Sequence, residues 1–298
     1  MLKKSAIRRI IISSFALILL LIIYNVPTDI NNNIKSTIVY DSVKDIPVYL
    51  SDYQNYASRV IVNSPNDNIE NIIELLTING KDKYLIPLGF KAVIPENTKL
   101  LNYHIKDNIL YLDFSYELLN VSLENEERLI ECLIYSLCEI KDIKGISISI
   151  NGEKLTKLPN SGKQLPPILS YDYGINKTYY IDNIKDTNQV TVYYLSNYQD
   201  LEYYIPITKI SNVQTSKIET IISELKTTPY INKNLSTYLK ASYELEQYEI
   251  LENSIKLTFN NELLTGLTDK NIEEELKYVL TLSIRDTYNI ENITIDIN

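Results

Sequence analysis

The sequence is poor in the residues that most enzymes and nucleotide-binding proteins use at their sites. Among 298 residues there are 7 glycines, 2 cysteines, 1 histidine and no tryptophan. A single histidine excludes sites built from several histidines, and few glycines leave little material for phosphate-binding loops. The net charge of −9 disfavours nucleic acid, because an acidic surface repels phosphate backbones. We therefore expect no metal, no cofactor, no nucleic acid and no small-molecule substrate.

The remaining composition is that of a folded protein. Hydrophobic residues make up 45% of the chain and charged residues 22%, both close to the average of globular domains. The length is sufficient for two domains of ordinary size. Tyrosine is abundant, with 25 residues, which is a compositional bias or the material for an aromatic binding surface.

The N-terminal segment has the charge pattern of a membrane anchor. Residues 1–9 contain four basic residues, and residues 10–26 contain none of either sign. Such a run just crosses a bilayer as a helix, so we predict an uncleaved signal anchor. The alternative is a cleaved signal peptide, but residues 24–27 (YNVP) offer no small-x-small cleavage site. The positive flank predicts a cell-membrane protein with a single span, a cytoplasmic N-terminus and extracytoplasmic residues 28–298.

A repeated phrase divides the rest of the chain. YLSDYQN at 49–55 returns as YLSNYQD at 194–200. IENIIELL at 69–76 returns as IETIISEL at 218–225, with apolar residues at i, i+3, i+4 and i+7, the spacing of one helix face. The repeat predicts two copies of one domain.

The second half of each copy follows the same plan. ILYLDF at 109–114 and SIKLTF at 254–259 alternate apolar and polar residues, as half-buried strands do. Residues 127–151 and 273–298 both read as a helix followed by a strand of alternating isoleucines. Each copy is predicted as strand–strand–helix–strand–strand–helix–strand. The expected fold class is α+β: two tandem small domains, each a β-sheet with helices packed on one face, behind a single N-terminal transmembrane helix.

The prolines and glycines of residues 158–189 argue against regular structure there. This stretch is a linker or a tail packed on the first domain. The predicted organisation is as follows: a cytoplasmic basic segment (1–9), a transmembrane anchor (10–26), a linker (27–45), domain 1 with a C-terminal extension (46–177), a linker (178–189) and domain 2 (190–298).

The first copy contains three further motifs: VYLSD at 48–52, IPENTKLL at 94–101 and LYLDFS at 110–115. With these motifs, residues 46–177 resemble the GerMN domain family of sporulation and germination proteins. The second copy lacks the Pro-x-x-Thr-Lys motif, and the internal repeat carries the assignment to it. The resemblance implies an outward-facing, membrane-tethered protein, similar to ring-building domains of secretion systems and not an enzyme. Members often use a lipid anchor, whereas this chain is predicted to use a helix.

The residues themselves offer no active site. His104 lies on a predicted strand and aligns with Glu249 of the second copy, so we expect an exposed structural position. Cys132 and Cys138 lie roughly 240° apart around one predicted helix and cannot form a disulfide there. We expect both thiols to be buried and inert.

The carboxylate pairs have an equally simple interpretation. They lie at predicted helix starts or on polar faces, where acidic side chains are solvated and favour the helix dipole: Glu126 and Glu127, Glu139 and Asp142, and Glu273, Glu274 and Glu275. Asp113 aligns with Thr258 and faces away from the core. Because polar residues differ between the copies, we expect no shared polar cluster and no catalytic, cofactor or metal residues.

These observations favour a structural or assembly protein of the cell envelope, acting in sporulation or germination. Expected partners are the membrane, other envelope or sporulation proteins, and further copies of the chain in rings. The alternative is a general envelope-binding module that recognises cell-wall polymer or a surface protein in vegetative cells. Four tyrosines would then stack on the ligand: Tyr171, Tyr173, Tyr179 and Tyr180.

Overall fold

The computed structural model describes residues 14, 15, 17, 44–183, 185–227, 234–260 and 274–297. The predicted basic segment and anchor (1–26) lie outside the described residues, except Ser14, Phe15 and Leu17, which are helical and exposed. The predicted linker 27–45 is described only at its last two positions. In the described part of the chain, no helix is long and apolar enough to cross a membrane.

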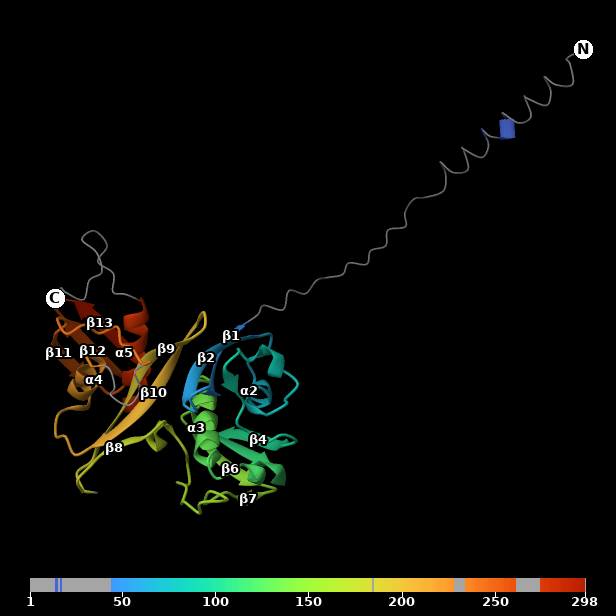
Figure 1. Ribbon diagram of the computed structural model, residues 1–298, viewed down its shortest axis with the longest axis horizontal. Helices are drawn as coiled ribbons and strands as arrows, with labels where there is room; N and C mark the ends of the chain where they lie inside the picture. The colour runs from blue at the N-terminus through green and yellow to red at the C-terminus, as the bar shows by residue number, and fades with distance from the viewer. Residues whose placement is uncertain are drawn as a thin grey trace, which may run out of the picture. The chain divides into compact units, whose positions relative to one another are not determined.

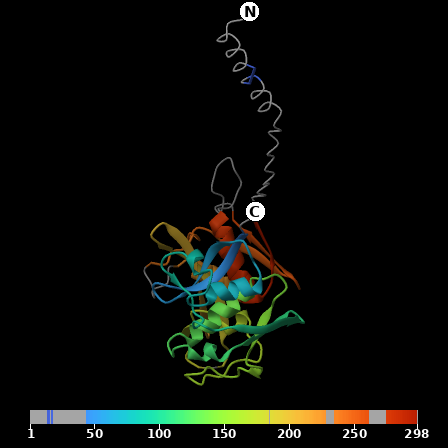
Figure 2. The ribbon, with the colours of Figure 1, turned by 90° about the vertical axis from the view of Figure 1, so that its right-hand side faces the viewer.

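The first copy contains its main strands and helices in the predicted order (Figures 1 and 2). The main elements are β1 (Lys44–Asp52), β2 (Ala57–Ser64), α2 (Ile69–Leu76), β4 (Leu100–Lys106), β5 (Ile109–Phe114), α3 (Glu126–Leu137) and β6 (Gly145–Ile150). Short elements lie between or after these: 3-10 helices at Lys83–Leu85 and Tyr116–Asn120, β3 (Phe90–Lys91) and β7 (Glu153–Lys154).

The second copy repeats the order. Its elements are β9 (Asn188–Tyr198), β10 (Leu201–Ser211), α4 (Lys217–Leu225), β11 (Leu245–Ile250), β12 (Ser254–Phe259), α5 (Glu274–Tyr288) and β13 (Asn292–Ile297). A capping box between Ser216 and Glu219 starts α4. The outer sheets also match: β5 pairs with β4 and β6 in the first copy, and β12 pairs with β11 and β13 in the second. The predicted alternation is confirmed, since the apolar residues of β5 and β12 are buried.

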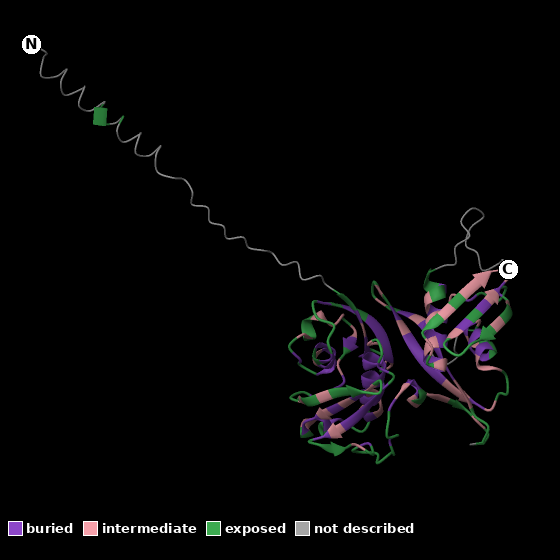
Figure 3. Ribbon diagram, turned by 180° about the vertical axis from the view of Figure 1, so that it is seen from behind, coloured by how far each residue is buried: buried purple, intermediate pink, exposed green. Residues whose placement is uncertain are grey.

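The first hairpins of the two copies join one sheet. β2 pairs antiparallel with β10 through Arg59 and Tyr204, so the hairpins β1–β2 and β9–β10 lie side by side. Figure 1 shows this shared sheet between the β4–β7 sheet and the β11–β13 sheet. In Figure 3 the buried residues concentrate along these hairpins. Residues 43–298 group as one compact unit, because pairing of backbone strands connects the copies directly.

The prediction of one sheet per copy with helices on one face is wrong. α2 and α3 contact β1, and α3 also contacts β6 of the other sheet. Nearly all residues of α3 are buried, from Leu129 to Leu137, as expected for a helix covered on more than one side. Sequence periodicity placed the strands correctly, but it carries no information on which strands share a sheet.

The segment after β7 packs on the first copy and then enters the shared sheet. Leu158, Leu165 and Leu169 are buried, so this part of the stretch is a packed tail. β8 (Thr178–Tyr180) lies within the predicted linker 178–189 and pairs in parallel with β10. The amide of Asn176 binds both hairpins: it accepts from Ala57 N at 3.0 Å and donates to Ala57 O at 2.8 Å and Pro206 O at 2.6 Å.

Candidate functional site

The positions considered for chemistry in the sequence do not come together in the fold. His104 is exposed on β4 and stacks on Tyr111, with ring centroids 4.8 Å apart. Cys132 and Cys138 are buried and free, as predicted. Burial raises the pKa of both thiols, that of Cys138 to about 12, so neither forms a thiolate near neutral pH. In the described ranges, no group of three His, Cys, Asp or Glu side chains could hold a metal ion.

The prediction that the carboxylate pairs are solvated is wrong for two of them. Glu126 is 2% exposed, and its carboxylate accepts hydrogen bonds from Asn160 N at 2.8 Å and Ser161 N at 3.0 Å. Glu126 therefore anchors the tail that follows β7. Glu139 is also buried, between the two copies. Both positions face solvent on an isolated helix, but the tail and the second copy cover them in the folded chain.

Glu139 is the centre of an ionic cluster between the copies. It accepts from Arg59 Nε at 3.0 Å, and from Arg285 Nη1 at 2.9 Å and Nη2 at 3.0 Å. Arg59 lies on β2 of the first copy and Arg285 on α5 of the second. Arg59 also donates to the hydroxyl of Tyr278, and Arg285 Nε donates to Asp286 Oδ1 at 2.7 Å. We call these residues, with Tyr49 and Tyr193, the junction cluster.

The two tyrosines of the junction cluster are related by the repeat. Tyr49 N donates to Ser136 Oγ at 2.8 Å, and Tyr193 N donates to Ser283 Oγ at 3.0 Å. The hydroxyl of Tyr193 donates to Asp286. The hydroxyl of Tyr49 has a single proton, which faces both Glu139 Oε1, 3.1 Å away, and the hydroxyl of Tyr193. Each copy thus contributes a tyrosine, a serine and, three residues after the serine, an acid. The two hydroxyls lie 2.6 Å apart, so the half-sites share a hydrogen bond.

This equivalence corrects the alignment taken from the repeated phrase. The phrase aligns Tyr49 with Tyr194, whereas the hydrogen bonds make Tyr193 the counterpart. The hairpins have different turns: the last pair is Ser51 with Ala57 in the first copy and Tyr198 with Leu201 in the second. A shift of one residue moves a side chain to the other face of a strand. The equivalent residues of the two copies are therefore those on the same face of the sheet, and not those that align in the repeated phrase.

Burial and charge set the protonation of the junction cluster. Burial would raise the pKa of Glu139, but attraction and hydrogen bonds from Arg59 and Arg285 lower it to about 2. Burial raises the pKa of Asp286, which is wholly enclosed and has Arg285 as its one cationic partner. Burial and the neighbouring carboxylates also raise the pKa of both tyrosines well above 10. Glu139 therefore stays ionised and the two tyrosines stay protonated near neutral pH, which suits a structural connection.

Sequence reasoning missed this cluster because it expected no shared polar group. The signal was present: SLCE at 136–139 and SIRD at 283–286 put a serine and an acid three residues apart at matching places. A cleft of about 450 Å³ lies next to the cluster and is lined by both copies, including Glu139, Arg285 and Tyr171.

The four tyrosines suggested for ligand stacking do not form one surface. Tyr171 is buried and Tyr173 is half-buried, while Tyr179 is 57% and Tyr180 53% exposed. Lys177 lies over the ring of Tyr173, 4.1 Å from its centroid. The exposed pair on β8 is too small for the predicted aromatic face.

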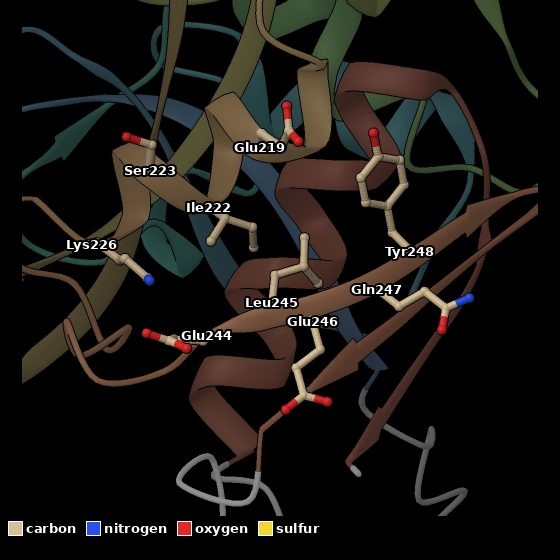
Figure 4. Close-up of a pocket in the computed structure, with 9 residues that line it drawn as sticks. All are labelled: Glu219, Ile222, Ser223, Lys226, Glu244, Leu245, Glu246, Gln247 and Tyr248. Atoms are coloured by element: carbon tan, nitrogen blue, oxygen red, sulfur yellow. The ribbon is translucent and has the colours of Figure 1, made fainter.

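Two further surface features occupy equivalent places in the copies. A groove of about 540 Å³ lies between α2 and β4, and one of about 470 Å³ lies between α4 and β11 (Figure 4). Four lining positions are identical in the two grooves: Glu70, Ile73, Leu100 and Tyr103 in the first copy, and Glu219, Ile222, Leu245 and Tyr248 in the second.

Comparisons with known proteins agree with this geometry. The sequence model of the Germane family, described as "Sporulation and spore germination", matches residues 47–156. The spore germination protein GerM of Bacillus subtilis (strain 168) is 27% identical over 258 residues, which are 84% of this chain and 70% of that protein. The solved structure of the tandem GerMN domains of the Bacillus subtilis sporulation protein GerM has a TM-score of 0.76 at 27% identity, covering 86% of this chain and 91% of that one. These findings confirm the resemblance seen in the sequence: residues 47–156 match the GerMN (Germane) family model, and most of the chain is similar to two GerMN domains in tandem.

Proposed function

We propose that this protein is a non-enzymatic component of an envelope complex that acts in sporulation or germination. The similarity to GerM over most of the chain supports the process. The assembly role is inferred from two structural features, the junction cluster and the sheet that the two copies share. The ion pairs of Glu139 with Arg59 and Arg285, and the pairing of β2 with β10 at Arg59 and Tyr204, hold the two copies in one arrangement. A rigid tandem unit holds the outer surfaces of the two copies in a fixed relative orientation. Repeated contacts in a complex require such a fixed orientation.

The protonation pattern supports a structural role over a catalytic one. Catalytic acids and bases need a pKa near the working pH and access to a substrate. In the junction cluster the carboxylate of Glu139 is held far below that range and the phenols of Tyr49 and Tyr193 far above it. The phenols of Tyr49 and Tyr193 are fully buried, and their hydroxyls contact each other and the acids of the cluster.

The proposal places the protein at the cell membrane. The uncharged run at 10–26 follows a basic segment, which favours a single span with residues 28–298 outside. Proteolysis of intact protoplasts tests this topology. A tag at the C-terminus should be lost and a tag at the N-terminus retained, and the reverse pattern would contradict the proposed orientation.

Imaging through growth and starvation tests the process. A fluorescent tag that matures outside the cytoplasm is fused to the C-terminus at the native locus. Expression late in starvation, with enrichment at the division septum or around the engulfed forespore, is expected. A uniform envelope signal during vegetative growth would contradict a sporulation role, and so would a host that forms no spores.

A further inference from the structure

The outer edges of the two copies carry strands with one pairing partner each. Among the described strands, β4 pairs only with β5 and β11 pairs only with β12. Both edge strands have a bulge at the matching place, between Leu100 and Asn102 and between Leu245 and Gln247. Figure 1 shows β4 and β11 at opposite sides of the shared sheet. An edge strand exposes backbone donors and acceptors that a strand of another chain can pair with.

The two edges carry opposite charge. Around β4 the exposed charged side chains are Lys99 and Lys106, with Asp107 directly after the strand, so residues 99–107 carry a net positive charge; His104 lies between the lysines. The corresponding stretch of the second copy exposes Glu244, Glu246 and Glu249. The difference arises at matched positions of the repeat, since Lys99 corresponds to Glu244 and His104 to Glu249.

Each edge also offers apolar contact area. Leu101 is 47% and Ile105 55% exposed on β4, and Ile250 is 47% and Leu251 51% exposed at the end of β11. Beside each strand lies the groove described above, which can receive side chains from an incoming strand. Each edge therefore offers three kinds of contact: unpaired backbone donors and acceptors, exposed apolar side chains, and charges opposite to those of the other edge.

We propose that β4 of one molecule docks on β11 of a second copy of this chain, head to tail. Like charge disfavours pairing of β4 with β4 and of β11 with β11, whereas β4 with β11 brings lysines to glutamates. Charged edge residues usually prevent strand association. Here the opposite charges of the two edges disfavour the symmetric contacts, β4 with β4 and β11 with β11, and favour the asymmetric contact of β4 with β11. A head-to-tail contact repeats, so it builds a ring or a filament and not a closed dimer. The inference rests on the proposed assembly function and gives it a surface.

Charge reversal on each edge tests the contact. The full chain in an uncharged detergent is followed by sedimentation over a range of concentrations, at low and at high salt. The first variant is Lys99→Glu with Lys106→Glu, and the second is Glu246→Lys with Glu249→Lys. Wild-type chain should associate with increasing concentration, and less so at high salt. Each variant alone should associate at least about tenfold more weakly, because its two edges then have like charge.

Mixing the two variants provides the decisive result. The reversed β4 of one then meets the reversed β11 of the other, so the equimolar mixture should regain association. The matched control is Lys154→Glu with Lys157→Glu, which changes charge equally at exposed positions on and after β7, the opposite edge of the β4 sheet. It should associate like wild type. A wild-type chain that stays monomeric, a mixture that does not recover, or a control that fails as strongly as the variants would each overturn the proposal.

Cysteine cross-linking separates the head-to-tail contact from a symmetric one. The native thiols are buried, so an introduced exposed cysteine reacts alone. Chains carrying Asn102→Cys should cross-link to chains carrying Gln247→Cys, and neither should cross-link to itself. Self-cross-linking of one variant would overturn the head-to-tail arrangement. Imaging of the tagged protein judges the proposed function separately: correct timing and place with a monomeric chain would reject only this contact.

Discussion

The hydroxyl oxygens of Tyr49 and Tyr193 lie 2.6 Å apart in the interior, one from each copy of the repeat. Both side chains are fully buried, and each hydroxyl also contacts an acid of its own copy. The pair therefore connects Glu139 to Asp286 through a chain of polar contacts, in which the one proton of Tyr49 faces both Glu139 and the hydroxyl of Tyr193. Two duplicated domains need not contact at equivalent residues. Here they do, and the contact lies where the first hairpins join in one sheet.

Replacing Tyr193 with phenylalanine tests this chain of hydrogen bonds. The ring remains packed, but Asp286 loses a donor while its carboxylate stays enclosed. The free energy of unfolding should fall by about 1–3 kcal/mol, the typical cost of an unsatisfied buried polar group. Urea denaturation followed by tyrosine fluorescence measures it. The matched control is Tyr179→Phe, because that ring is exposed and should leave stability unchanged. Equal stability of Tyr193→Phe and wild type would show that the bond adds nothing.

Glu139→Gln removes the charge that pairs Arg59 with Arg285. The buried guanidinium of Arg59 and the half-buried one of Arg285 then face a neutral amide, and unfolding should become easier by about 3 kcal/mol, the lower end of the typical cost of breaking a buried ion pair. Glu124→Gln is the matched control, because Glu124 lies exposed just before α3. A loss no greater than that of the control would contradict a stabilising role for Glu139.

The same pair of proteins makes a prediction about pH. The pKa of Glu139 is about 2 in the folded chain and 4.5 ordinarily, so its ionised form favours folding. This contribution is fully present above pH 4.5 and is lost as the pH falls toward 2. The difference in unfolding free energy between wild type and Glu139→Gln should therefore shrink across that interval. The pKa of Asp286 is raised, which gives the opposite sign. Burial, the main cause, acts in both proteins, whereas the lesser effect of the Glu139 charge is absent from Glu139→Gln, so this contribution cancels only in part. A difference that stays constant down to pH 2 would contradict the lowered pKa.

The sequence predicted the order of the main strands and helices because those patterns are local. Leu110, Leu112 and Phe114 alternate, and Ile255, Leu257 and Phe259 repeat the alternation, so each strand shows its own buried face. The pairing of β2 with β10 has no such signature. It joins Arg59 to Tyr204, residues far apart in the chain. Nothing in the sequence of either strand specifies the other as its partner, because any two edge strands of suitable length can pair.

Glu139 shows the same limit for the site. Its place at the end of a helix correctly suggested a polar position, but burial there depends on α5 of the second copy, which supplies Arg285. The serine and acid shared by the two copies could have been recognised by comparing polar residues as carefully as apolar ones. Even then the contact between Tyr49 and Tyr193 would have stayed hidden, because the repeated phrase aligns the wrong tyrosine.

The thiols offer a test that requires no mutation. Cys132 is fully buried and Cys138 nearly so, and burial raises the pKa of both. Under native conditions at pH 8 a chromogenic disulfide reagent should modify neither within the time that a free thiol needs to react fully. In denaturant both should react at once. Rapid native reaction of one thiol per chain would mean that α3 is accessible from outside.

Gly89→Ala tests a contact between the first copy and the hairpin of the second. Gly89 has φ +91°, and a Cβ there would lie 2.6 Å from the ring of Tyr198. The substitution therefore combines backbone strain with overlap of side chains. Gly152 has φ +84° with nothing near its Cβ position, so Gly152→Ala measures the strain alone. Strain of this kind costs roughly 1 kcal/mol or more, and Gly89→Ala should cost clearly more than Gly152→Ala in urea denaturation.

A second substitution identifies why Gly89→Ala should cost more stability than Gly152→Ala. In the background Tyr198→Ala the ring is absent, so the cost of Gly89→Ala should fall to that of Gly152→Ala. A double-mutant cycle gives this difference as the interaction between the two positions. If Gly89→Ala costs the same with and without the ring, the loop before β3 does not pack on the second hairpin. The packing of the two copies would then depend on their other contacts, such as the junction cluster, the shared sheet and the hydrogen bonds of Asn176.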